Sequence, residues 1–249
     1  MISGPRALLM QAADPLAVEG LLAHSSEIDE PYKRLERTAE VMSAIGFDSR
    51  ERADRMTKRV RKMHAKVSGT LDHAVGPFPA GTPYAADDPK LLMWVLFTLV
   101  DSGIVVYERF VKRLTRAEKE GYWADFRIVG NLFGLADSDM PADLAELDAY
   151  RHDRYASGEL IVTDWARRTA REIVMEPPVP VQFRPLLEAA NFITVALLPK
   201  LIRDQYGFFR LPPGPLRELT VNAYAAYVKR AVLPFMPSRV RRIPVARAA

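Results

Sequence analysis

Residues 91–107 read LLMWVLFTLVDSGIVVY, the most apolar stretch of the chain. A membrane span usually needs about 20 apolar residues, and this run is interrupted by Asp101 and Ser102. A charged side chain in the middle of a span would also be costly. The stretch therefore predicts a buried helix of a soluble protein rather than a membrane span.

Helical signals continue on both sides of this stretch. The preceding segment, residues 68–87, is rich in glycine and proline and is predicted to be a loop. Pro89 suits a first helical turn, so we expect the long helix to run from there to about Leu114. Thr115 opens the capping-box sequence T-R-A-E, which predicts a next helix that Gly134 ends.

The rest of the chain is also helical by its apolar periodicity, and no segment alternates convincingly with period two. From Ser49 to Val67, apolar residues recur at steps of three and four, at Ala53, Met56, Val60, Met63 and Val67. Further helices are expected at about 17–24, 33–45, 141–155, 164–175, 184–203 with a break at Pro199, and 217–233. These patterns predict one all-α domain, residues 1–249, with about eight to ten helices and a basic, disordered tail at about 238–249.

Composition excludes several kinds of site. The chain has no cysteine, which excludes disulfides, thiolate catalysis and iron–sulfur or zinc sites held by cysteine. The four histidines lack metal-ligand spacing, so we expect no zinc site built from several of them. A cofactor that needs a single histidine, such as haem b, stays open. The net charge of +4 is small and is not concentrated beside aromatic residues, so nucleic acid is not an expected partner.

Two of the three stretches that stand out hold polar side chains at helical spacing. In KRLERT, Arg34 and Thr38 are four residues apart and therefore share one face of a helix. In RKMHAKVSG, Arg61 and His64 are three residues apart and also share a face. Spacing alone leaves two interpretations of His64, a satisfied and partly buried histidine or a ligand.

The third stretch is the apolar helix itself. Steps of three and four place one stripe along it, made of Trp94, Thr98, Asp101, Val105 and Glu108. A buried carboxylate is costly unless it is paired, so Asp101 predicts a structural ion pair with an arginine or bonds to neighbouring helices. Trp94 is expected in the core, although a haem or another flat apolar ligand also needs walls of this kind.

Taken in order, these stretches resemble the rubber-oxygenase catalytic-domain family. That family includes the latex-clearing proteins and the endoplasmic-reticulum-bound oxygenase of mycophenolic acid biosynthesis. The resemblance covers nearly the whole chain and is strongest in YAADDPKLLMWVLFTLVDS, residues 84–102, and VYERFVKRLTRAEKEGYW, residues 106–123. A later L-L-P-x-x-x-R-x-x-Y-G pattern matches Leu197, Leu198, Pro199, Arg203, Tyr206 and Gly207.

The resemblance implies an all-helical fold around a b-type haem. The latex-clearing members cleave carbon–carbon double bonds with dioxygen. The family's R-x-x-H pattern, which holds the proximal ligand, maps onto Arg61 and His64, and its distal R-x-x-x-T pair maps onto Arg34 and Thr38. Position 37 holds Arg37, where latex-clearing members tend to carry lysine. The arginines are expected to pair with haem propionates, because a guanidinium matches the two oxygens of a carboxylate.

Leu96 departs from the family pattern. Many relatives read W-V-H where this chain reads Trp94-Val95-Leu96, and leucine can neither ligate iron nor transfer a proton. Trp94 and Thr98 are still expected to line the cofactor. Two functions follow as hypotheses. One is a haem-b-dependent oxygenase that acts with dioxygen on an apolar substrate, isoprenoid, polyketide or lipid-like. The other is a haem- or lipid-binding helical module without turnover.

A third interpretation is a peripheral membrane protein. It would use the basic C-terminus and the apolar segment near residues 192–198. The N-terminus shows no secretory signal, and the lack of cysteine fits a reducing compartment. We therefore expect a cytoplasmic location, with membrane association as the alternative.

Overall fold

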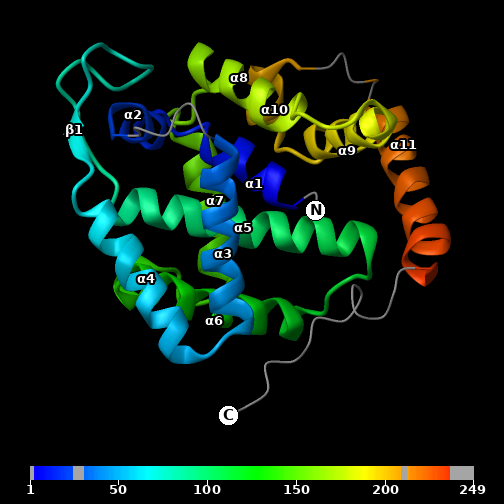
Figure 1. Cartoon of the computed structure of the whole chain (residues 1–249), viewed down its shortest axis with the longest axis horizontal. Helices are drawn as coiled ribbons and strands as arrows, with labels where there is room; N and C mark the ends of the chain where they lie inside the picture. Colours follow the sequence, from blue (N-terminus) through cyan, green and yellow to red (C-terminus); the bar gives the residue numbers. More distant parts are fainter. Residues whose placement is uncertain (1–2, 25–30, 209–211, 213, 236–249) are drawn as a thin grey trace.

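The computed structural model of the chain describes residues 3–24, 31–208, 212 and 214–235 (Figure 1). In this part the protein is one mostly helical domain with eleven α-helices and a two-stranded sheet, which confirms the all-α prediction. The helices are α1 (Ser3–Gln11), α2 (Pro15–His24), α3 (Pro31–Phe47), α4 (Arg50–His64), α5 (Pro89–Phe110), α6 (Arg116–Phe133), α7 (Leu144–Ala156), α8 (Asp164–Ala170), α9 (Arg184–Ala196), α10 (Lys200–Tyr206) and α11 (Gly214–Tyr227). The basic tail expected at about 238–249 lies outside the described residues.

The long apolar helix α5 begins and ends through local hydrogen bonds. The Asp88 carboxylate accepts from the Lys90 backbone N–H at 2.7 Å, and Pro89 occupies the first turn, as predicted. The helix ends at Phe110, four residues before the expected end. Val111 leaves the helical conformation at φ −118° and ψ −81°, and the Leu114 N–H then donates to the Glu108 side chain instead of to a helical carbonyl.

The cap that opens α6 was predicted from the T-R-A-E sequence. Thr115 and Glu118 form the expected capping box, in which each side chain accepts from the backbone N–H of the other residue. Gly134 closes the helix in the left-handed conformation at φ 107°, which glycine adopts without the steric cost of a Cβ atom. Pro199 also interrupts the C-terminal helices as predicted, because α9 ends at Ala196 and α10 begins at Lys200.

Helix α1 was not expected from the sequence, where its apolar run is short. It packs along α5 in the middle of the molecule, with Leu9 and Met10 almost completely buried (Figure 1). Its helical conformation is therefore stabilised mainly by tertiary packing rather than by a strong local signal.

The buried charge on α5 has a partner on α1. Arg6 Nη2 lies 2.7 Å from Asp101 Oδ2, and Nη1 donates to Ser102 Oγ at 2.7 Å. Arg6 Nε donates to the Leu197 carbonyl at 2.9 Å. One buried guanidinium thus joins α1, α5 and the end of α9, and the ion pair expected for Asp101 is confirmed.

The segment predicted as a loop contains a small β-hairpin. Strands β1 (Ser68–Thr70) and β2 (Pro83–Ala85) pair antiparallel, with Gly69 opposite Tyr84. Leu71, Val75 and Tyr84 form a small cluster with partly buried residues of the hairpin and α2. The loop prediction was wrong at the strands, because the three-residue strands Ser-Gly-Thr and Pro-Tyr-Ala are too short to show a readable alternation.

The main core surrounds α5. Among the described residues, α5 is long and apolar enough to cross a membrane by length and composition. Its Trp94, Val100 and Ser102 are nevertheless at most 1% exposed and pack inside the protein. Because α1 and α6 also pack directly on this helix, it is the central helix of the fold, and the buried helix predicted from the sequence is confirmed.

Burial of three tyrosines predicts instability at high pH. Burial raises the pKa of Tyr150, Tyr155 and Tyr206, because the charged phenolate loses its hydration. The fold therefore favours their neutral form. The stabilisation from this preference is complete below the unfolded pKa of about 10 and is lost as the pH rises further.

We expect these three of the nine tyrosines to ionise only together with alkaline unfolding. The measurement is an ultraviolet titration of tyrosinate absorbance with circular dichroism recorded in parallel. Denatured protein is the control, in which every tyrosine should ionise near pH 10. Full ionisation near that pH with the helical signal intact would contradict the prediction.

Candidate cofactor site

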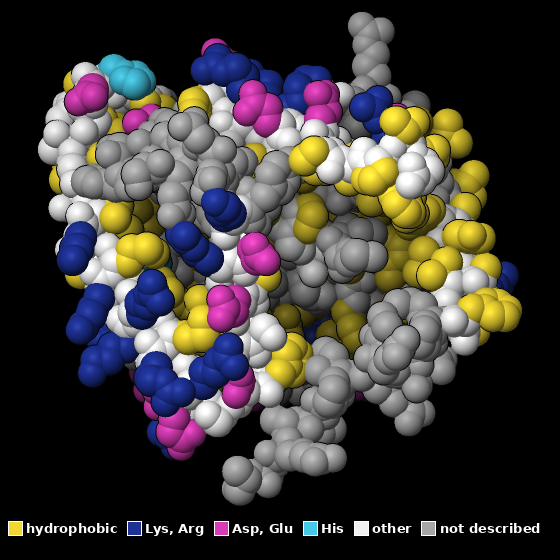
Figure 2. Space-filling model, viewed as in Figure 1, with side chains coloured by type: hydrophobic (Ala, Val, Ile, Leu, Met, Phe, Trp, Pro, Cys, Tyr) yellow, Lys and Arg dark blue, Asp and Glu magenta, His cyan; other side chains and the backbone are white. Residues whose placement is uncertain are grey.

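Two helices carry five of the seven predicted site residues. Helix α3 holds Arg34, Arg37 and Thr38, and α4 holds Arg61 and His64. The two helices pack against each other, and α4 also packs on α6 (Figure 1). Lys and Arg side chains gather over these helices in Figure 2. The predicted polar residues therefore lie at one cationic end of the molecule.

Helix α4 turns His64 toward the interior. Its buried or half-buried positions include Ala53, Thr57, Val60 and His64, which follow steps of three and four along one face. The Thr57 hydroxyl satisfies itself locally by donating to the Ala53 carbonyl at 2.9 Å. Met63, which the apolar pattern placed on the inward face, is 56% exposed, so that part of the prediction was wrong.

His64 ends α4 close to the start of α5. Val67, just beyond the helix, accepts a backbone hydrogen bond from Ala86 at 2.9 Å. Ala86 precedes α5 by only a few residues, so the hairpin ties the two helix ends together.

Arg61 contacts the end of α6. A Cβ atom at Gly134 would lie 3.5 Å from Arg61 Nε, so the guanidinium packs over the C-terminal cap of that helix. The Arg61 side chain is exposed, whereas His64 is half-buried. On α3, Arg37 and Thr38 are exposed. The Arg34 side chain lies outside the described part of the structure.

Trp94 and Thr98 belong to a different interface, between α5, α1 and α7. Both side chains are fully buried. Trp94 stacks on Phe97 at a ring-centroid distance of 5.7 Å. Thr98 accepts from Gln11 Nε2 at 3.0 Å and donates to the Val95 carbonyl. Their observed contacts are core contacts, which is one of the two interpretations that the sequence left open for Trp94.

A buried ionic group next to Trp94 was missed in the sequence. Arg154 pairs with Asp14 and Glu159, and its guanidinium lies 5.3 Å from the centre of the Trp94 ring. Burial raises the pKa of Asp14, while the charge of Arg154 opposes that rise. No local sequence pattern predicts this ion pair, because Asp14 and Arg154 are 140 residues apart.

Leu96 fills the interface between α5 and α6. It is buried, and a Cβ atom at Gly130 would lie only 3.0 Å from Leu96 Cδ2. Met140 and Leu135 approach the same glycine. Leu96 therefore packs among apolar side chains at the α5–α6 interface.

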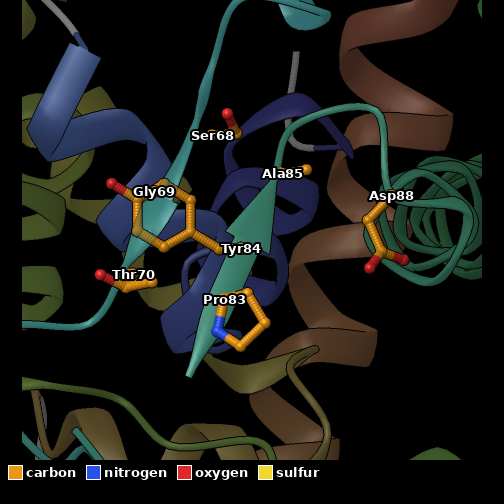
Figure 3. A pocket seen from close by; sticks show the side chains of 7 residues that line it. All are labelled: Ser68, Gly69, Thr70, Pro83, Tyr84, Ala85 and Asp88. Atoms are coloured by element: carbon orange, nitrogen blue, oxygen red, sulfur yellow. The ribbon is translucent and has the colours of Figure 1, made fainter. Parts of the chain in front are cut away.

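The hairpin carries a shallow pocket of about 480 Å³, lined by Ser68, Gly69, Thr70, Pro83, Tyr84, Ala85 and Asp88 (Figure 3). The Tyr84 ring covers Gly69, where a Cβ atom would lie 2.5 Å from the phenol oxygen. Asp88 is already engaged as the cap of α5. None of the predicted site residues lines this pocket, so it is separate from the candidate cofactor site.

The described fold is a helical domain, and comparison with known families places it in the class of oxygenase catalytic domains. Residues 1–230 match the family described as ER-bound oxygenase mpaB/B'/Rubber oxygenase, catalytic domain. The chain belongs to this family, which confirms the family expected from the sequence. No curated protein and no solved structure matches the chain.

Proposed function

We propose that the protein is a haem-b-dependent oxygenase that acts with dioxygen on an apolar substrate of the isoprenoid, polyketide or lipid-like class. His64 is the proposed proximal ligand of the iron. The observation that carries the proposal is the inward position of His64 at the end of α4, in a chain that matches an oxygenase family over residues 1–230.

The donor set fits a haem better than a bare metal ion. In the described residues, no group of three histidine, cysteine or acidic side chains could hold a metal ion. A haem brings four nitrogen ligands of its own and needs one imidazole from the protein. His64 supplies that imidazole, and Arg61 and Lys62 in the same helical turn supply positive charge for propionates.

Other residues would orient the cofactor and shape access to it. Arg34 and Thr38 lie about one turn apart on α3, where Thr38 can exchange hydrogen bonds with a distal water. Arg37 offers a further guanidinium on that helix. Bound haem would supply dioxygen activation. The protein would control polarity, water and substrate access around it.

Trp94 and Thr98 are proposed as more distant members of the site. Trp94 Nε1 is buried and has no hydrogen-bond partner among the described residues, which leaves a donor for a ligand. Thr98 already uses its hydroxyl within the protein, so its role would be to hold α5 in place.

A second candidate function is a haem- or lipid-binding module without turnover. Leu96 favours it, because a buried apolar side chain stands where many relatives carry an imidazole. Under this alternative the protein binds its ligand but consumes no dioxygen.

The two functions are distinguished by adding hemin to the purified protein, recording the visible spectrum, and then measuring oxygen uptake. We expect a Soret band that saturates at one haem per chain. Polyene, terpenoid and fatty acyl compounds should then be tested in an oxygen electrode, with the haem-free protein as control. Substrate-dependent uptake supports the oxygenase, and a saturable Soret band without uptake supports the non-catalytic module. A protein that binds no haem would contradict the oxygenase proposal.

A further inference from the structure

Exposed apolar side chains gather at the C-terminal side of the molecule. Figure 2 shows hydrophobic side chains over α9 and α11. We call this the C-terminal apolar surface and define it by six residues that are more than half exposed: Val181, Phe183, Leu186, Leu216, Leu219 and Tyr227. Val181 and Phe183 belong to a short 3-10 helix, Val181–Phe183, that precedes α9. An exposed apolar surface of this kind marks a contact with a partner or a membrane.

Helix α11 is apolar on two opposite faces. Its inner face packs Val221 and Ala225 against Phe110 and Ile193 in a separate small core. Its outer face repeats Leu216, Leu219, Ala223 and Tyr227 at steps of three and four, all exposed. A helix on the surface of a water-facing protein normally has one apolar stripe. The second stripe therefore indicates a binding partner that covers this face, since the protein core does not.

The sequence that follows Glu218 carries charge of one sign. After Glu218 the sequence contains no acidic residue, and residues 219–249 contain six Lys or Arg. The net charge of +4 is thus +6 in this segment and −2 in residues 1–218. Glu218 itself is paired with Arg109 at 3.1 Å. Lys229 and Arg230 are exposed immediately after α11.

We propose that the C-terminal apolar surface docks on an anionic lipid bilayer. A bilayer surface takes up an apolar face together with a surplus of basic residues, because the side chains enter the headgroup boundary and the cations meet anionic lipids. Tyr227 and Phe183 add aromatic side chains, which favour that boundary. A protein partner or a second copy accounts for the stripe but gives no reason for the purely basic sequence after Glu218.

The proposed membrane contact differs from the one expected from the sequence, which used residues 192–198. In residues 192–198, Ile193, Val195 and Leu198 are at most 3% exposed and cannot reach a membrane. The outer face of α11 replaces them. Arg109, at the end of α5, donates to Asn222 of α11 at 2.5 Å, so docking would hold the central helix beside the bilayer.

The proposal is tested by co-sedimentation of the full chain with phosphatidylcholine vesicles, with and without phosphatidylserine. We expect binding to the anionic vesicles that weakens as salt is added. The double variant Leu216→Ser, Leu219→Ser should bind about tenfold more weakly or worse, from the loss of apolar transfer. Ile128→Ser on α6 is the matched control, since Ile128 is 61% and Leu219 64% exposed. Circular dichroism checks that each variant is folded.

A second pair of variants tests the charges. Removal of three C-terminal arginines should weaken binding to anionic vesicles by about tenfold or more. Removal of three exposed cationic side chains from α4 should leave the binding to anionic vesicles nearly unchanged. The two sets are Arg239→Gln, Arg241→Gln, Arg242→Gln and Lys58→Gln, Arg59→Gln, Lys62→Gln. Equal losses in both sets would overturn the proposal, as would no binding to anionic vesicles. A dimer abolished by the leucine variant, with no vesicle binding, would show that a second copy is the occupant.

The vesicle assay needs no added haem. The docking proposal therefore fails or stands independently of the proposed oxygenase activity, and the same preparation can be assayed for both.

Discussion

The His64→Ala protein is expected to lose the Soret band that the wild-type protein gains when hemin is added. His64 is the only histidine of α4 and lies on its inward face. Hydrogen-bond partners of a metal-bound histidine are worth about 10–100-fold in metal affinity. Loss of the ligand itself should therefore weaken haem binding by at least about 100-fold. The measurement is a hemin titration followed in the visible spectrum.

His152→Ala is the matched control for this experiment. His152 is an exposed histidine of α7, whose Nδ1 contacts the Asp148 carbonyl of its own helix. Its removal should leave the Soret band unchanged. Free imidazole added to the smaller variant His64→Gly should restore part of the band, because it can occupy the vacated position. An unaltered band in His64→Ala would show that His64 does not bind the iron, and it would contradict the proposed site.

The Arg6→Met protein is expected to lose about 3–5 kcal/mol of its free energy of unfolding, because the change leaves a buried carboxylate unpaired. The Arg6 side chain is 3% exposed, and that of Asp101 is 14% exposed. The same change removes donors from Ser102 and from the Leu197 carbonyl. Urea denaturation, fitted as a two-state transition, measures the loss.

Two further variants show whether the loss comes from breaking the buried ion pair or from removing any charged side chain. The double variant Arg6→Met, Asp101→Met should recover much of the loss, because apolar side chains often replace a buried ion pair without a net cost. Arg116→Met breaks an exposed pair with Glu120 and should leave the free energy of unfolding nearly unchanged, because water screens exposed charges. If Arg6→Met costs no more than Arg116→Met, the buried pair is not a stabilising link between the three helices.

Much of the helical pattern was readable because its signals are local. Asp88 and Pro89 start α5, Thr115 opens α6, and Gly134 closes it. Each acts within one turn through a backbone hydrogen bond or a backbone angle, so neighbouring residues suffice to predict it. The hairpin was missed because its short strands depend on pairing with each other and on packing against α2.

The candidate site was readable in part. The histidine and arginine motifs and the family resemblance singled out His64, and residues 1–230 match that family. Haem ligation by His64 remains a prediction. Periodicity placed Met63 on the inward face of α4, whereas the structure exposes Met63 and half-buries its neighbour His64, because the helices that pack against α4 decide which way it faces. The partners of Trp94 and Thr98 were equally hidden, because they come from α1 and α7.

The sequence alone established most of the helices, the caps of α5 and α6, and the family, since these rest on neighbouring residues and on recognisable motifs. Only the tertiary structure paired Arg6 with Asp101 and Asp14 with Arg154, and only it exposed the second apolar face of α11. The physical reason is distance along the chain. An ion pair between residues about a hundred positions apart, or the burial of one helix face, exists only after the whole chain has brought distant segments into contact.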